Sequence, residues 1–232
     1  MYDAARVAAD GRTTAARFAV TAAEAGFDGV VVANSHENPA EYDPAAIADA
    51  YDIDVVDGVE IATTDKGELS GAVTNHRRET TALLVRGGTE TVNRYAVETP
   101  AVDVLRDPMA GNGDVNHVVV KAAARNDVRI EVNFGPVLRA SGGPRVQALR
   151  GLRKLRALLK YFDAPFVVSA APTTHLQVRG PRELIAVGEQ IGFEADQVRA
   201  GLAEWRRIAE ENREKLSSAY VTEGVRRGRY DE

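Results

Sequence analysis

The sequence predicts an α/β fold, a distorted TIM-like (β/α) barrel built on one parallel sheet. Seven short apolar runs rich in β-branched residues recur through the 232 residues, and helical spacing separates most of them. The runs lack the polar alternation of half-exposed strands, so we expect helices to cover the sheet. Strands and helices that alternate in this way form βαβ units.

The expected strands are the apolar runs themselves, of which the first is the weakest. They lie at Tyr2–Val7, Asp28–Ala33, Ile53–Ile61, Thr80–Val85, Val102–Leu105, Val128–Phe134 and Phe166–Ala170. After Ala170 the sequence reads as a loop and then helices, so the eighth strand of a complete barrel is expected to be irregular or missing. An open doubly wound sheet is the alternative arrangement.

Helical spacing marks the segments between and after the strands. The expected helices are Thr13–Gly26, Pro44–Tyr51, Glu68–Arg77, Thr89–Glu98, Asp114–Asn126, Arg145–Tyr161, Pro181–Ile191, Ala195–Ala203 and Glu204–Ser217. Thr13 or Thr14 can cap the first helix, and Pro181 and Gly192 suit the start and the end of a later one. We expect one domain over residues 1–217 and a basic, polar tail over residues 218–232.

Composition narrows the classes of function. The chain has no cysteine, which excludes disulfides, thiol catalysis and thiolate metal sites. No apolar run is long enough to span a bilayer, and the first residues lack the apolar core of a signal peptide, so we expect a cytoplasmic protein. Arginine outnumbers lysine by 24 to 5. This bias suits phosphate binding, GC-rich coding or a salt-adapted source, and we expect the last of these.

A basic block stands out in a chain whose net charge is −5. Between Arg139 and Lys160 there are seven Arg or Lys residues and no carboxylate. On a helix these cations spread over about half of the circumference, and leucines occupy the other half. The block is either a solvated helix face or a binding surface for a polyanion. We expect this helix to lie outside the barrel, away from any site at the strand ends.

Polar residues follow the strands where parallel α/β folds collect functional groups. The residues at these exits are His36, Glu60, Arg86, Arg106, Asp107, Asn133 and Ser169. They form either a site or ordinary rim and capping residues. The four histidines show no HxH or HExxH spacing, and no GxSxG or Walker sequence occurs, so neither metal hydrolysis nor nucleophilic catalysis is favoured. We therefore expect no catalytic residue and no metal or other cofactor bound by the chain itself.

Phosphate binding needs only basic groups, and the few aromatic residues form no visible stacking platform, so recognition of RNA backbone and shape is the function favoured here. A metal-dependent barrel phosphoesterase and a protein-interaction module without RNA contact remain the alternatives. Arg106, Arg150, Arg153, Lys154 and Arg156 are candidate RNA contacts on charge and position.

An ordered series of segments resembles a known family. It comprises Asp57–Ile61, Leu84–Gly88, Asn93-Arg94, Glu98–Pro100, Val102–Leu105, Asp114, Asn116-His117, Lys121–Ala123, Arg129–Phe134, Ala164–Ala170 and Val178–Leu184. In order and spacing these segments resemble archaeal ribonuclease P (RNase P) protein component 3. The resemblance covers nearly the whole chain.

The resemblance implies a TIM-barrel-like protein that binds RNase P RNA and other protein components, particularly component 2. The holoenzyme removes the 5′ leader of precursor tRNA, and its RNA carries out the hydrolysis with divalent metal such as Mg²⁺. The family is related to PHP-type barrel phosphoesterases, which begin with an HxH strand. This chain departs from that pattern at Asp3–Arg6 and leaves Glu60 as a possible relic.

The family pattern also carries basic positions. By resemblance, the further candidate RNA contacts are Arg86, Lys121, Arg145, Arg179 and Arg182.

Overall fold

Seven parallel strands form one sheet, in which each strand pairs with the next along the chain. The structure is a computed structural model that describes residues 1–7, 12–217, 220–222 and 225–226. The strands are β1 (Tyr2–Arg6), β2 (Gly29–Ser35), β3 (Asp54–Ile61), β4 (Ala82–Arg86), β5 (Val104–Arg106), β6 (Arg129–Asn133) and β7 (Phe166–Ser169). The sheet curls so far that the Arg6 N–H donates to the carbonyl of Pro172, just beyond β7, at 3.0 Å. The result is a nearly closed barrel.

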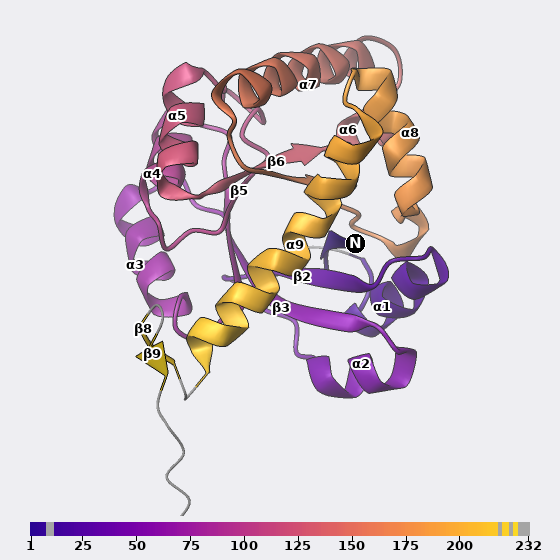
Figure 1. Cartoon of the computed structure of the whole chain (residues 1–232), viewed down its shortest axis with the longest axis vertical. Helices are drawn as coiled ribbons and strands as arrows, with labels where there is room; N and C mark the ends of the chain where they lie inside the picture. Colours follow the sequence, from indigo (N-terminus) through magenta and orange to yellow (C-terminus); the bar gives the residue numbers. More distant parts are fainter. Residues whose placement is uncertain (8–11, 218–219, 223–224, 227–232) are drawn as a thin grey trace, which may run out of the picture.

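Helices surround this barrel (Figure 1). They are α1 (Ala15–Glu24), α2 (Pro44–Tyr51), α3 (Lys66–His76), α4 (Glu90–Glu98), α5 (His117–Asn126), α6 (Gly135–Arg139), α7 (Gly142–Phe162), α8 (Pro181–Ile191) and α9 (Ala195–Leu216), with a 3₁₀ turn η1 (His175–Gln177). Tyr220–Thr222 (β8) and Val225–Arg226 (β9) pair as a small antiparallel hairpin. No helix in the described part of the chain is both long and apolar enough to cross a membrane.

Side chains from the sequence fix where several helices begin. Thr14, Asp43, Asp65, Thr89 and Asn116 each stand at an N-cap, and each accepts a hydrogen bond from a backbone N–H in the first turn. Such caps satisfy amides that have no partner within the helix. Of the two threonines predicted to cap the first helix, the second is therefore the cap.

Strand alternation divides the sheet into two faces. The outward face, with residues such as Val32, Leu83 and Ile130, packs with the helices into the larger core. The inward face contributes Ala4, Val31, Val56, Leu84, Val104 and Val167 to a second, smaller core. Because side chains alternate along a strand, the next inward positions toward the carboxyl ends point into the same interior. Those positions are polar, as described below.

Helix α9 closes the amino-terminal end of the barrel. It crosses the molecule diagonally in Figure 1, and Trp205 and Ile208 complete the inner core. The Trp205 indole N–H donates to the carbonyl of Val168 at 2.8 Å. Close approach depends on Gly201, because a Cβ there would lie 2.6 Å from a methyl of Val168. Helix α9 therefore seals the apolar interior at the amino-terminal end, which leaves the carboxyl-terminal end for a functional site.

The predicted fold class is confirmed, and so are the seven strands. The expected irregular closure is also seen, since within the described residues no eighth strand lies between β7 and β1.

Two helix predictions were wrong. The segments 195–203 and 204–217 form the single helix α9, because no proline interrupts the polypeptide and Gly201 is packed against β7 within the helix. The five-residue α6 was not predicted. Of the expected tail, residues 218–219, 223–224 and 227–232 lie outside the described residues.

Candidate functional site

Polar side chains fill the carboxyl-terminal mouth of the barrel, with Glu60 of β3 at the centre. Glu60 is 1% exposed and accepts hydrogen bonds from Arg6 at 2.9 Å and from Arg106 at 2.7 Å. Arg86 of β4 also pairs with it. Three guanidinium groups from three different strands thus converge on one carboxylate.

Glu131 of β6 is the second buried carboxylate of the mouth. It accepts from Arg106 Nε at 3.0 Å, from the Ser169 hydroxyl at 2.6 Å and from the backbone N–H of Asp107 at 3.1 Å. Arg106 therefore bridges Glu60 and Glu131 and is itself fully buried. This bridge connects β3, β5 and β6 across the inside of the barrel.

Asp107 completes the network on the side nearer the solvent. Its carboxylate accepts from Arg6 Nη2 at 2.6 Å and from the Asn133 amide at 2.6 Å. The mouth therefore contains three arginines and three carboxylates, the latter being Glu60, Glu131 and Asp107. Their formal charges cancel.

Burial and ion pairing compete in setting the pKa values of these groups. Burial alone would raise the pKa of Glu60, but Arg106 and Arg6 beside it hold that pKa below its ordinary value. The same competition, with Arg6 as the nearest cation, lowers the pKa of Asp107. Burial dominates at Glu131, whose pKa is raised despite Arg106.

Asp3 is a separate, fully buried carboxyl group beside the network. Its Oδ1 accepts from the backbone N–H groups of Ala4 and Ala170, at 2.8 and 3.0 Å. Its Oδ2 is buried and has no partner. Burial raises the pKa of Asp3 to about 7, although the two backbone donors favour the charged form.

The mouth does not fit a metal ion. The oxygens of Glu60, Glu131 and Asp107 already accept from guanidinium, hydroxyl and amide groups, and an arginine cannot act as a ligand. The backbone N–H of His36 donates to the carbonyl of Glu60 at 3.2 Å, but its ring accepts from the Ala62 N–H at 3.4 Å and makes no hydrogen bond to the network among the described residues. Potential ligand atoms of His36, Glu37 and Glu68 lie within 4.8 Å of one another, but both glutamates are exposed. The prediction that the chain binds no metal stays a prediction.

A cavity of about 410 Å³ opens beside the network. Asp107, Glu131 and Asn133 lie on its polar side, and Gly151 and Leu152 of α7 line the opposite wall. The expectation that the basic helix lies away from the strand ends was therefore wrong. Because α6 turns the chain across the rim after β6, α7 begins above the carboxyl ends of the strands.

Helix α7 presents most of the basic block to solvent. Leu152, Leu155 and Leu159 are buried, whereas Arg150 and Arg153 on the opposite face are exposed. Among the described residues, no carboxylate pairs with Arg145, Arg150, Arg153, Arg156 or Lys160. Lys154 is the exception, since its ammonium group lies 2.6 Å from Asp114.

Two members of the basic block are held by contacts within the protein. Arg139 ends α6 and donates from Nη1 to the carbonyl of Ala170 at 2.8 Å, so it braces the rim. Arg156 is half-buried, and its guanidinium packs over Gly192.

The other candidate RNA contacts occupy three places. Lys121 is exposed on α5, which packs against α7. Arg182 is exposed in the first turn of α8, and the half-buried Arg179 donates to the carbonyls of Leu176 and Val178. Arg86 is partly exposed at the mouth, with its side chain 34% accessible. Arg106 is excluded as an RNA contact in this structure because it has no exposed surface.

Six residues of the mouth are predicted from the strand ends, and three are not. Glu60, Arg86, Arg106, Asp107, Asn133 and Ser169 do converge, as expected for parallel strand ends. Arg6, Glu131 and Asp3 were missed. Glu131 sits inside the expected strand Val128–Phe134, and counting every second residue back from Asn133 would have placed it on the inward face.

The fold and the mouth define the class of protein: a (β/α) barrel whose strand-end site is filled by ion pairs. The fold matches histidinol phosphate phosphatase from Lactococcus lactis, a structure complexed with zinc, L-histidinol and phosphate. The match has a TM-score of 0.58 and 10% identity, over 83% of this chain and 94% of that one. At that identity the likeness concerns the fold alone.

Sequence comparison then gives the family. The model of the RNase P subunit p30 family matches residues 1–217, and the chain belongs to this family. It is 54% identical to the ribonuclease P protein component 3 of Haloarcula marismortui, over 97% of this chain and 96% of that one. Identity to the component 3 of Halobacterium salinarum is 51%, over 100% and 99% of the two chains. The salt-adapted source expected from composition agrees with these halophilic relatives.

A solved assembly supports the same assignment. A chain of an archaeal RNase P determined by cryo-electron microscopy with mature tRNA matches with a TM-score of 0.84 and 25% identity, over the full length of both chains. The family resemblance inferred from the ordered sequence segments is thereby confirmed.

Proposed function

We propose that this chain is a non-catalytic protein subunit of RNase P and that α7 binds the RNA of the holoenzyme. The observation that carries the proposal is the exposure of the α7 cations and their lack of carboxylate partners. They are concentrated on one helix of an acidic protein, all but the half-buried Arg156 are exposed, and five of the six lack a described carboxylate partner. Unpaired guanidinium groups are available for bidentate contacts with phosphate.

The filled mouth supports a role without catalysis. Hydrolysis by a barrel of this kind needs a group that can activate water, usually at a metal with an open position. Here the buried carboxylates hold guanidinium groups instead. The cleavage chemistry would then belong to the RNA with its Mg²⁺, and precursor tRNA would be met through the holoenzyme.

The partners proposed for the chain are RNase P RNA and the other RNase P proteins, especially component 2. A cytoplasmic location follows from the same role. The solved archaeal RNase P provides a precedent, because its matching chain was determined within that enzyme together with mature tRNA.

Reconstitution tests the proposal directly. Precursor-tRNA cleavage is measured with RNase P RNA and the remaining protein components, with and without this chain, over a series of Mg²⁺ concentrations. Omission is expected to slow cleavage at limiting Mg²⁺ and to raise the Mg²⁺ requirement, because a stabilising protein contact with the RNA fold is lost. An identical rate, Mg²⁺ requirement and thermal tolerance without the chain would contradict the proposal.

Metal analysis tests the phosphoesterase alternative separately. Protein purified without chelators is expected to contain no stoichiometric zinc, manganese or iron. Stoichiometric metal that is lost on replacing His36 and Glu68 with Ala would favour the alternative, because those residues lie in the one described group of ligands close enough to share an ion.

A further inference from the structure

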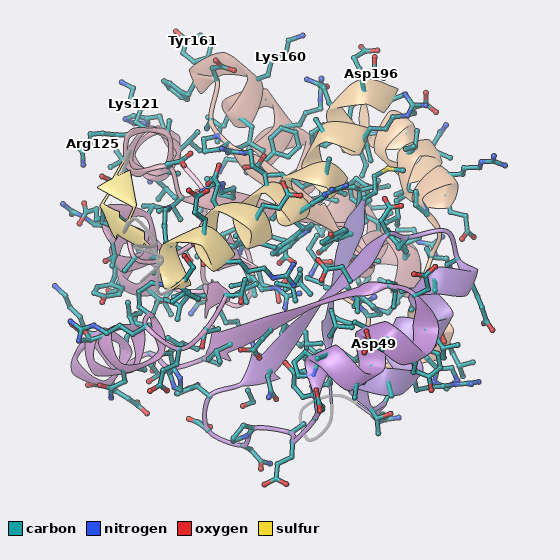
Figure 2. All side chains as sticks on the ribbon, turned by 60° about the horizontal axis from the view of Figure 1, so that its bottom comes forward. Asp49, Lys121, Arg125, Lys160, Tyr161 and Asp196 are labelled. Carbon is teal, nitrogen blue, oxygen red and sulfur yellow. The ribbon has the colours of Figure 1, made fainter. Side chains whose placement is uncertain are left out.

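Tyr161, near the end of α7, is the most exposed of the large apolar side chains that the structure describes, at 81%. Its ring meets the ring of Phe162 edge to face, with centroids 4.7 Å apart. Figure 2 shows Tyr161 and Lys160 projecting outward from the end of α7. An aromatic face left in water gains nothing for folding. The ring is therefore available to a binding partner.

The surroundings of Tyr161 are cationic. Lys160 precedes it on α7, and Lys121 and Arg125 lie on the neighbouring helix α5, where Figure 2 shows them also directed outward. Lys121 Nζ lies 5.2 Å from the centroid of the Phe162 ring, which ties α5 to this aromatic pair. No carboxylate of the described residues pairs with Lys160, Lys121 or Arg125.

The nearby acidic residues do not cancel this charge. Asp127, which ends α5, pairs with Arg129 at 3.2 Å. Asp163, which ends α7, is the single unpaired carboxylate directly next to the aromatic pair among residues that the structure describes. Around the aromatic pair, the three cations Lys121, Arg125 and Lys160 therefore outnumber the one unpaired carboxylate, Asp163.

Tyr161 also continues the basic stripe of α7. Arg150, Lys154 and Tyr161 follow one another at spacings of four and seven residues, which places them on one face of the helix. An RNA strand held along this stripe by its phosphates would therefore reach the ring at the end of the helix.

We propose that Tyr161 stacks on an unpaired base of an RNA while Lys121, Arg125 and Lys160 bind the flanking phosphates. This inference rests on the proposed function and extends it, because the sequence favoured recognition of backbone and shape only. An unpaired base suits the site because an exposed ring offers a flat face for stacking and the cations around it match phosphates. A protein partner would have to supply a carboxylate for each of these cations, whereas every linkage of an RNA strand carries a phosphate.

Binding of the purified chain to RNase P RNA, at a fixed high salt concentration, tests the stacking. Tyr161→Ala is expected to lower the affinity about 10-fold, a typical loss for one stacked base. Tyr161→Phe keeps the ring and should bind within about 2-fold of the parent protein. The matched control is Tyr51→Ala: Tyr51 also ends an exposed helix, but between Asp49 and Asp52, so its removal should leave affinity unchanged.

Salt dependence separates stacking from charge. Because a stacked base releases no counterions, Tyr161→Ala should lower affinity without changing the slope of log affinity against log salt. Lys160→Ala should instead reduce the magnitude of that slope by about 0.7 for one phosphate contact to a single strand. A changed slope for Tyr161→Ala would overturn the stacking interpretation.

Fluorescence gives a readout that does not depend on affinity. In Tyr161→Trp the new indole is exposed, whereas the native Trp205 is buried in the barrel and supplies a constant background. RNase P RNA is expected to quench the emission of the new indole. Quenching that is absent at saturating RNA would overturn the proposal.

The remaining outcomes separate this inference from the function on which it rests. If the parent protein binds RNase P RNA and Tyr161→Ala binds equally well, the stacking fails and the proposed function stands. If Tyr161→Ala keeps its RNA affinity but weakens binding to another RNase P protein, the ring is a protein contact and the inference is wrong. If the parent protein does not bind the RNA at all, both fail.

Discussion

Helices α7 and α9 have similar lengths, 21 and 22 residues, and both are rich in arginine. They differ in whether those arginines form ion pairs. Along α9, Arg206 and Arg207 pair with glutamates three or four residues away, and Arg213 pairs with Asp54 of β3. Along α7 there is no carboxylate in the helix at all. An arginine-rich helix therefore indicates a polyanion surface only when its own sequence leaves the charges unpaired.

The barrel mouth extends this comparison to buried arginine. There Arg106 is inaccessible and is held by two carboxylates, so its charge serves the interior and not a partner. The three regions form a series: buried and paired in the mouth, exposed and paired on α9, exposed and unpaired on α7. Substitution of a charged residue is therefore expected to have a different effect in each of the three regions.

The largest effect is expected at the mouth. Glu60→Gln leaves Arg6, Arg86 and Arg106 without their shared charge partner, and loss of one member of a buried ion pair costs about 3–5 kcal/mol. The free energy of unfolding in denaturant, at constant salt, measures it. The matched control, Glu210→Gln, removes the exposed partner of Arg206 and should cost far less, because solvent screens that pair. Equal losses would break the distinction between mouth and surface.

Asp3 tests the opposite case, a buried charge without a cation partner. Its folded pKa of about 7 lies above the ordinary value of 3.8, so the folded state favours the neutral acid. The stability due to this proton is complete below pH about 4 and is lost as pH rises to about 7, up to roughly 4 kcal/mol.

An amide at this position stays neutral and can still accept from Ala4 and Ala170. Relative to the parent protein, Asp3→Asn should therefore gain stability as pH rises from 4 to 8. Denaturant unfolding of both proteins across that range measures the difference. A difference that stays constant with pH would contradict the assignment of the titrating group.

A charge-matched pair of triple variants tests α7 against α9 directly. Replacing Arg150, Arg153 and Lys160 with Ala should lower affinity for RNase P RNA on the order of 100-fold and reduce the salt slope by up to about 3. Replacing Arg199, Arg206 and Arg207 of α9 removes the same net charge from paired residues, so RNA affinity should change far less. If both triples weaken binding equally, RNA responds to net charge and not to the α7 surface.

The smallest effect concerns the geometry of the contacts. Replacing Arg150 and Arg153 together with Lys keeps the charge of α7 but removes the planar fork that binds phosphate through two hydrogen bonds. At high salt diffuse attraction is screened, so a loss of several-fold in RNA affinity is expected. Unchanged affinity would show that point charges are sufficient on this helix.

Much of the architecture could be predicted from sequence because strand positions depend on local pattern. Buried parallel strands read as β-branched runs, and parallel topology brings their exits together, which correctly predicts that Glu60 and Asn133 share one site. Burial of an individual charge is not local. Arg106 looked like a surface cation because nothing in its own segment reveals that Glu60 and Glu131, from two other strands, enclose it.

The remaining misses also have physical causes. Five residues that begin Gly135-Pro136 are too few to show helical periodicity, so α6 was missed, and with it the path that brings α7 over the strand ends. Tyr161 was missed as a site because exposure of one aromatic residue depends on whether another helix covers it. That is decided by tertiary packing.

Helix α9 has a consequence for how the chain is made. Trp205 fills the interior of the barrel, and Asn212 ties the starts of β4 and β5 together through Thr81 and Asp103. Yet α9 leaves the ribosome only after all seven strands have emerged. Until then the strands have an open, apolar interior, so nascent chains are exposed to aggregation and chaperone binding for longer than chains whose core closes early. Closure of the barrel is therefore coupled to the synthesis of α9.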